Sequence, residues 1–180
     1  MTALGCIFIV VLGTLGHFLF EWCSHSHVAG LFFAVNESTW EHIKLTIYPT
    51  FLWAGVEIAC GGLTAALPVA VAGGLVTTML LVPGLFYGYT AVTRKNWLVP
   101  DIICFIIAVY CGMLVHERIL GAGEPCNGLV AVSLAVLALI LVLYFLFSYH
   151  PPHNFLFKDP VSGGYGPKGH DCHAHFHSHR

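Results

Sequence analysis

The stretch LVAVSLAVLALILVLYFLFSY, residues 129–149, decides the fold class. It carries no charged side chain over about 20 positions, which is the length that a helix needs to cross a hydrocarbon layer of roughly 30 Å. A soluble core in a chain of this size does not need an uninterrupted apolar run of that length. The stretch therefore predicts a membrane-spanning helix.

The composition of the whole chain agrees with a membrane protein. Of its 180 residues, 57% are hydrophobic and only 9% are charged, against roughly 25% charged residues in an ordinary soluble domain. The net charge of -2, without any basic run, excludes a nucleic-acid partner. Four further apolar runs lie at residues 2–22, 43–67, 69–92 and 98–117. We therefore expect an all-α, polytopic transmembrane bundle of five spanning helices over residues 1–150, surrounded by the lipid bilayer.

The positive charges predict how this bundle is oriented. Most of them follow the third or the fifth span, at Arg94, Lys95, Lys158, Lys168 and Arg180, and only Arg118 marks the other side. Because cytoplasmic loops carry an excess of Lys and Arg, we expect an N-out/C-in topology in the inner (cytoplasmic) membrane of the cell. After the bundle we expect an interfacial segment at residues 151–166, with Phe155 and Phe157 in the interface, and a flexible His-rich tail at residues 167–180.

One pair of glycines predicts where a helix approaches another. Gly84 and Gly88 form a GxxxG pattern within the third span. Glycines with this spacing leave a smooth strip on a helix, against which a neighbouring backbone can pack closely. We therefore expect a close helix–helix contact at this pair.

Ionisable side chains gather at the predicted cytoplasmic ends of the spans. They are His17, Glu21, Glu37, Glu41, His42 and Asp101. His17 and Glu21 share one face of the first helix because they are four residues apart. Ionisable groups are costly inside a membrane, so they are functional candidates by default. The spans therefore predict one polar layer on the cytoplasmic side.

Imidazoles and carboxylates together are the ligand set that suits zinc, iron or manganese. We expect a divalent metal ion, zinc before the others, with the ligands His17, Glu21, His42 and Asp101. In this model Glu37 or Glu41 is the general base, and Lys44 or Arg94 contacts an anionic headgroup. The corresponding reaction is metal-assisted hydrolysis of a lipid or prenyl-type substrate.

Other interpretations of the polar residues stay open. Ser38 and Glu41 fit a capping box, in which each side chain accepts a hydrogen bond from the backbone of the other. Glu57 and His116 form a second, thinner polar layer nearer the outside, which is either a structural ion pair or part of a transport path. The alternatives to a hydrolase are thus a metal-ion or proton transporter, a metal-handling protein, and a non-catalytic scaffold. The oligomeric state stays open as well.

The chain ends in the sequence HDCHAHFHSHR, residues 170–180. Its candidate metal ligands are His170, Cys172, His173, His175, His177 and His179. Several imidazoles close together on one strand bind Zn, Ni or Cu. We therefore expect a tail that captures metal ions; the alternative is a solvated terminus without a dedicated role.

The nine residues Asn36-Glu37-Ser38-Thr39-Trp40-Glu41-His42-Ile43-Lys44 resemble the Asn-Glu-Ser-x-Trp-Glu-His-x-Lys signature of a bacterial and archaeal family of integral membrane proteins with no assigned function. Two further regions are similar to that family. One is HFLFEW at residues 17–22, where the family pattern has Tyr in place of Phe20; the other comprises PPH, LFKDP and GYG between residues 151 and 166. The resemblance implies a membrane-embedded fold and an important signature, and it supplies no reaction.

Overall fold

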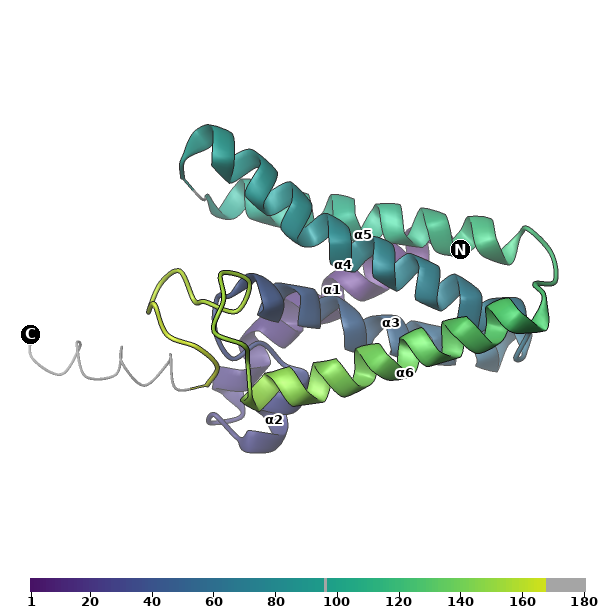
Figure 1. Cartoon of the computed structure of the whole chain (residues 1–180), viewed down its shortest axis with the longest axis horizontal. Helices are drawn as coiled ribbons and strands as arrows, with labels where there is room; N and C mark the ends of the chain where they lie inside the picture. The colour runs from purple at the N-terminus through teal and green to yellow at the C-terminus, as the bar shows by residue number, and fades with distance from the viewer. Residues whose placement is uncertain (96, 168–180) are drawn as a thin grey trace, which may run out of the picture.

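The computed structural model describes residues 1–95 and 97–167, and this part of the chain forms six α-helices (Figure 1). They are α1 (Thr2–Trp22), α2 (His27–Phe32), α3 (Thr39–Gly61), α4 (Ala66–Thr93), α5 (Leu98–Leu120) and α6 (Asn127–Tyr149). The fold is all-α, as the apolar runs predict. The candidate ligands of the tail, from His170 to His179, lie outside the described residues.

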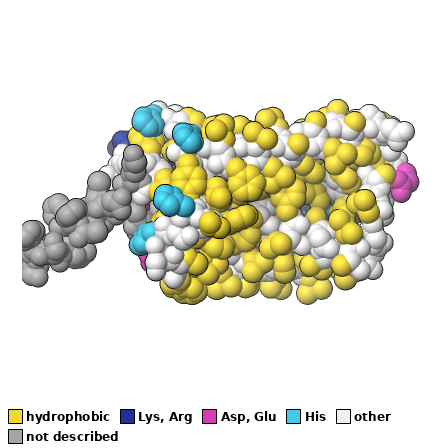
Figure 2. Space-filling view, turned by 90° about the horizontal axis from the view of Figure 1, so that it is seen from below, with side chains coloured by type: hydrophobic (Ala, Val, Ile, Leu, Met, Phe, Trp, Pro, Cys, Tyr) yellow, Lys and Arg dark blue, Asp and Glu magenta, His cyan; other side chains and the backbone are white. Residues whose placement is uncertain are grey.

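Four of these helices, α1, α4, α5 and α6, are long and apolar enough to cross a membrane. They expose large apolar side chains, among them Ile7, Leu80 and Val142. In Figure 2, apolar side chains cover the middle of the visible face, and charged and His side chains lie toward its two ends. Extended apolar surface of this kind suits contact with lipid rather than with water. The length and composition of the helices thus indicate a membrane protein.

The remaining long helix, α3, coincides with the predicted span at residues 43–67 but begins and ends earlier. It carries Glu41, Lys44 and Glu57, and it is not among the four strongly apolar helices. All three charged side chains are buried, because α3 packs against both α1 and α4. The hydropathy of α3 alone therefore does not indicate that its charged side chains are buried.

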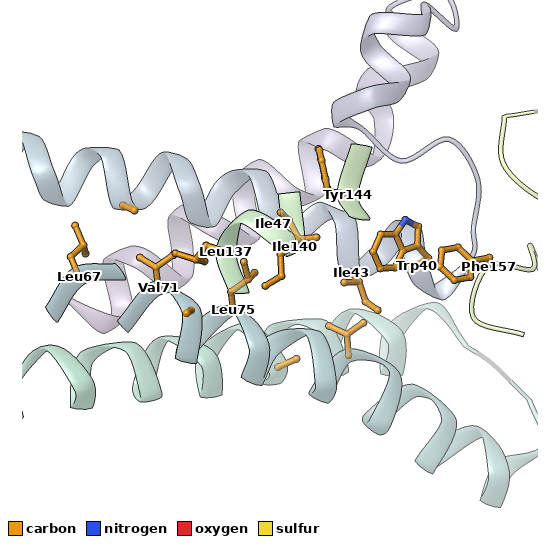
Figure 3. Packing of buried hydrophobic residues seen from close by; sticks show 14 residues of the cluster. Trp40, Ile43, Ile47, Leu67, Val71, Leu75, Leu137, Ile140, Tyr144 and Phe157 are labelled. Carbon is orange, nitrogen blue, oxygen red and sulfur yellow. The ribbon is translucent and has the colours of Figure 1, made fainter. Parts of the chain in front are cut away.

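The main core lies where α3, α4 and α6 meet (Figure 3). Ile47 of α3 and Leu75 of α4 are among its fully buried side chains. At the end of this core the ring of Trp40 lies 5.0 Å, between centroids, from the ring of Phe157. Phe157 is therefore buried rather than interfacial, whereas Phe155 is exposed as expected.

Helices α4 and α5 approach each other closely at a place that the sequence did not indicate. A Cβ atom on Gly112 would lie 2.7 Å from the carbonyl oxygen of Gly74, so the two backbones touch. In contrast, a Cβ atom on Gly84 or Gly88 would meet nothing within 4 Å among the described residues. The predicted contact at that GxxxG pair is therefore absent from the described fold.

The C-terminal segment (residues 151–166) folds back over the end of the bundle at which α3 begins. The carbonyl oxygen of Leu156 accepts a hydrogen bond from the backbone N–H of Trp40 at 2.9 Å. The carbonyl oxygen of Gly166 accepts one from the side-chain amide of Asn36 at 3.1 Å. Asp159 is buried and accepts hydrogen bonds from the backbone that follows it. The segment is thus packed as a cap on the bundle, and its last residue lies beside Asn36.

Candidate metal centre

Three of the predicted polar residues come together where α1 ends and α3 begins. Nε2 of His17 lies 3.1 Å from one carboxylate oxygen of Glu37, and Nε2 of His42 lies 3.9 Å from the other. One ligand atom from each residue lies within 4.8 Å of the other two. In the part of the chain that the structure describes, this His17–Glu37–His42 cluster is the one group of three such side chains within metal-binding distance.

A close approach between α1 and α3 brings the two histidines together. A Cβ atom on Gly13 would lie only 2.9 Å from the carbonyl oxygen of Leu45, so the lack of a side chain at Gly13 allows this contact. His17 lies about one turn after Gly13, and His42 lies about one turn before Leu45. The imidazole rings consequently face each other with 5.5 Å between centroids.

The residue that caps α3 orients the imidazole of His42. Nδ1 of His42 lies 3.0 Å from the carbonyl oxygen of Ser38, and because a carbonyl oxygen only accepts, Nδ1 must carry the proton. The lone pair of the neutral ring is then on Nε2, the nitrogen nearest to Glu37. A backbone carbonyl that holds the other nitrogen in this way is the usual support of a metal-binding histidine.

The cluster lies in the wall of a pocket of about 590 Å³ between α1, α3, α4 and α5. The pocket walls are mostly apolar, with side chains such as Val10, Phe86 and Phe105. Pro160 and Val161 of the C-terminal segment also line it. The three polar side chains are partly exposed, so the pocket places a candidate metal-ligand set beside a mostly apolar space.

The other two predicted metal ligands lie outside the cluster. Asp101 lines the same pocket from the start of α5, but its carboxylate accepts a hydrogen bond from the hydroxyl of Tyr89. Glu21 is exposed near the end of α1 and does not line the pocket. In their place Glu37, which the sequence indicated as a general base, is the carboxylate between the two histidines.

Glu41 and Lys44 are paired with each other instead of facing the pocket. Nζ of Lys44 lies 2.9 Å from a carboxylate oxygen of Glu41, and both side chains are buried. The same oxygen of Glu41 accepts a hydrogen bond from the Val35 N–H at 3.0 Å. Half of the predicted capping box is present, because Ser38 Oγ accepts from the Glu41 N–H. The other half is not, since the side chain of Asn36 accepts from the Ser38 N–H.

The ammonium group of Lys44 joins three helices. It donates to the carbonyl oxygen of Gly30 in α2 at 2.9 Å and to the hydroxyl of Ser148 in α6 at 3.4 Å. The ring of Tyr144 lies 5.9 Å from the same nitrogen. Lys44 is fully buried, so its position suits a structural role behind the cluster rather than contact with a headgroup.

The second polar layer is a buried pair between α3 and α5. Nε2 of His116 lies 3.0 Å from one carboxylate oxygen of Glu57, while the second oxygen of Glu57 is buried and has no hydrogen-bond partner among residues 1–95 and 97–167. The cavity beside His116 measures only about 10 Å³. Of the two interpretations of this layer, the geometry therefore favours the ion pair that joins two helices.

Some residues that shape the site were not indicated by the sequence. Asn36 holds both the start of α3 and the end of the C-terminal segment, and Pro160 and Val161 help to enclose the pocket. Asn36 belongs to the nine-residue signature, and this membership is the one feature of the sequence that could have indicated its role. The two residues of the C-terminal segment carry no periodic pattern that could have placed them.

A family model described as a family of unknown function (DUF6512) matches residues 1–167. The chain belongs to this family. No curated protein and no solved structure matches the chain. The DUF6512 match covers all six helices and the C-terminal segment, and it ends where the His-rich tail begins.

Proposed function

We propose that this DUF6512 protein is a membrane-embedded, metal-dependent hydrolase whose substrate is a lipid-type molecule. The observation that carries the proposal is the His17–Glu37–His42 cluster, which lies at the wall of a large, mostly apolar pocket. Two imidazoles and one carboxylate form a known ligand set of catalytic zinc sites, in which a fourth position is left for water or substrate. Zinc held there would supply a hydroxide nucleophile at neutral pH and polarise an acyl or phosphoryl oxygen.

The chain's own residues have distinct roles in this proposal. His17, Glu37 and His42 hold the ion, and the carbonyl oxygen of Ser38 keeps Nε2 of His42 free to bind it. Asp101 lines the same pocket, where its carboxylate can accept a proton from an incoming water or return one to a leaving group. Its hydrogen bond with Tyr89 orients that carboxylate.

The pocket walls favour a substrate with an apolar tail. The same pocket is lined by apolar side chains from three helices, among them Val10, Leu45 and Phe105. Side chains of this kind do not hold a small polar molecule in place, but they suit an acyl or prenyl chain. The hydrolysed bond would then lie at the junction between the tail and its polar head.

The proposed topology has five spans, with the N-terminus outside and the C-terminus in the cytoplasm. α3 is 23 residues long, which is about 34 Å of helix and enough to cross the hydrocarbon layer. Its charges are paired within the bundle, as Glu41 with Lys44 and Glu57 with His116. In this topology the bundle spans the inner membrane of the cell, and the cluster and the C-terminal segment lie on its cytoplasmic side.

A metal-ion or proton transporter needs a continuous polar path through the bundle. The cavity beside His116 holds about 10 Å³, and the Glu57–His116 pair that would continue the path is buried between α3 and α5. The pocket at the cluster is much larger. This difference in size favours a reaction or binding site at one end of the bundle over transport through it.

Metal analysis of the purified protein tests the centre. The tail would bind metal by itself, so the reference chain is full length with the five tail histidines changed to glutamine and Cys172 changed to serine. We expect this chain to retain about one zinc equivalent after dialysis. His17→Ala or His42→Ala in the same background should weaken zinc binding more than the roughly 10–100-fold that loss of a supporting residue costs.

The matched control is His116→Gln, because this histidine is buried in the other polar layer. Its zinc content should equal that of the reference chain. Zinc binding that survives both His17→Ala and His42→Ala would overturn the proposed centre. The reaction itself is tested with a panel of acyl, phosphoryl and prenyl-phosphate lipids in micelles, where turnover should require zinc and should fall with Asp101→Asn.

A further inference from the structure

The end of the described chain is held next to the candidate metal centre. The side-chain amide of Asn36 donates to the carbonyl oxygen of Gly166 at 3.1 Å, and Asn36 is 6% exposed. The next residue after Asn36 is Glu37, one of the three residues of the cluster. The described chain therefore ends beside Asn36, the residue that precedes the candidate ligand Glu37.

The sequence that follows this anchor is rich in metal ligands. Residues 167–180 contain five histidines and Cys172, whose imidazole and thiol groups bind zinc-type cations. The first of them, His170, is four residues after Gly166, which is at most about 14 Å of extended chain. The family match ends at residue 167, so these ligands are additional to the matched domain.

We propose that the His-rich tail collects zinc-type divalent cations and passes them to the His17–Glu37–His42 cluster. The proposal rests on the proposed function, since it requires that the cluster bind a metal ion. The transfer is a ligand exchange: one tail imidazole leaves the ion for each nitrogen or oxygen of the cluster that binds. Zinc stays divalent throughout, so no electron moves; a proton carried by a cluster imidazole passes to water when the ion binds, and a tail thiolate that leaves the ion takes one up.

Tethering explains why such a transfer would be useful. In this proposal a short linker would hold the tail's ligands near the cluster at an effective concentration in the millimolar range, far above free zinc in a metal-poor medium. The tail therefore changes how fast the cluster is loaded when zinc is scarce. It does not change the final occupancy once zinc is plentiful.

The test measures the rate of zinc loading with the full-length chain. Wild type is compared with the chain in which the five tail histidines are glutamine and Cys172 is serine, with zinc supplied from a chelating buffer at half an equivalent. Cluster-bound zinc is the fraction that resists a brief chelator wash in wild type and is lost in His42→Ala. We expect wild type to load at least about tenfold faster, and equal occupancy of both chains at saturating zinc.

A synthetic peptide of residues 167–180 tests the need for the tether. Added at the micromolar concentration of the protein to the tail-substituted chain, it should leave loading slow. Equal loading rates of the two chains, or full recovery with the free peptide, would overturn the inference while the metal centre stands. If neither chain holds chelator-resistant zinc at saturation, the proposed function fails first.

Discussion

At the scale of single residues, the side chain of Lys44 is held by contacts with several helices. Its ammonium group is fully buried and is neutralised by Glu41 at 2.9 Å. It also donates to the backbone of Gly30 and to Ser148. A charge of this kind is tolerated only because each of its donors has a partner. Lys44 thus fixes the positions of α2 and α6 relative to α3, behind the two histidines that face the pocket.

Removing this ammonium should destabilise the fold strongly. Lys44→Met leaves the buried carboxylate of Glu41 unpaired, which typically costs about 3–5 kcal/mol. We expect a correspondingly lower midpoint when unfolding of the purified protein in mixed micelles is followed by circular dichroism. The double variant Glu41→Gln/Lys44→Met, which removes both charges, should recover part of the loss. A single variant as stable as wild type would contradict the structural role.

At the scale of helices, α4 and α5 depend on contact between their backbones. Gly112→Ala would place a Cβ atom 2.7 Å from the carbonyl oxygen of Gly74, and this oxygen cannot move without moving α4. We expect a loss of about 1–3 kcal/mol from such overpacking, measured as above. Gly84→Ala on α4, the other helix of the pair, is the matched control, because its Cβ would meet nothing within 4 Å among the described residues. Equal effects of the two substitutions would contradict this packing.

The long helices could be predicted from the sequence, and the short elements could not. Apolar runs of about 20 residues leave few alternatives to a spanning helix, which is why α1 begins and ends at the predicted residues. α2 has only six residues, fewer than two turns, and so carries no helical period. The C-terminal segment is ordered by contacts with Trp40 and Asn36, which its local pattern does not encode.

The same limit applies to the candidate site. The positions of His17 and His42 along their helices predict that both lie at one level of the bundle, and they do face each other. That level does not specify the direction in which a side chain points around the helix axis. Asp101 lines the pocket, but its carboxylate accepts a hydrogen bond from Tyr89. The carboxylate of Glu41 forms a salt bridge with Lys44. Glu37 lies in a loop, so its place between the histidines required the folded chain.

At the scale of the whole molecule, the number of spans can be tested by labelling two native cysteines from one side of the membrane. Cys23 follows α1 and Cys126 precedes α6, and both are exposed. With five spans the two lie on opposite sides of the membrane, whereas four spans without α3 would place them on the same side. We expect a chain whose sole cysteine is Cys126 to react with a membrane-impermeant maleimide in intact cells. A chain whose sole cysteine is Cys23 should react only after permeabilisation.

The control for this labelling is a chain without cysteine, which should remain unlabelled under both conditions. Labelling of Cys23 and Cys126 from the same side would contradict the crossing of α3. Labelling of Cys23 alone in intact cells would keep five spans but reverse the N-out/C-in orientation. Each result therefore separates the span count from the orientation.

The pairing of α3 also bears on the order in which the chain is made. This helix leaves the ribosome before α5 and α6, yet Glu57 has its partner on α5 and Lys44 has one of its partners on α6. Ionised side chains without such partners are costly in lipid. In the proposed topology, the nascent α3 must therefore stay sheltered by the insertion machinery until the last helix has been synthesised. Integration of the third helix into the membrane is then a late, cooperative event rather than a step taken in chain order.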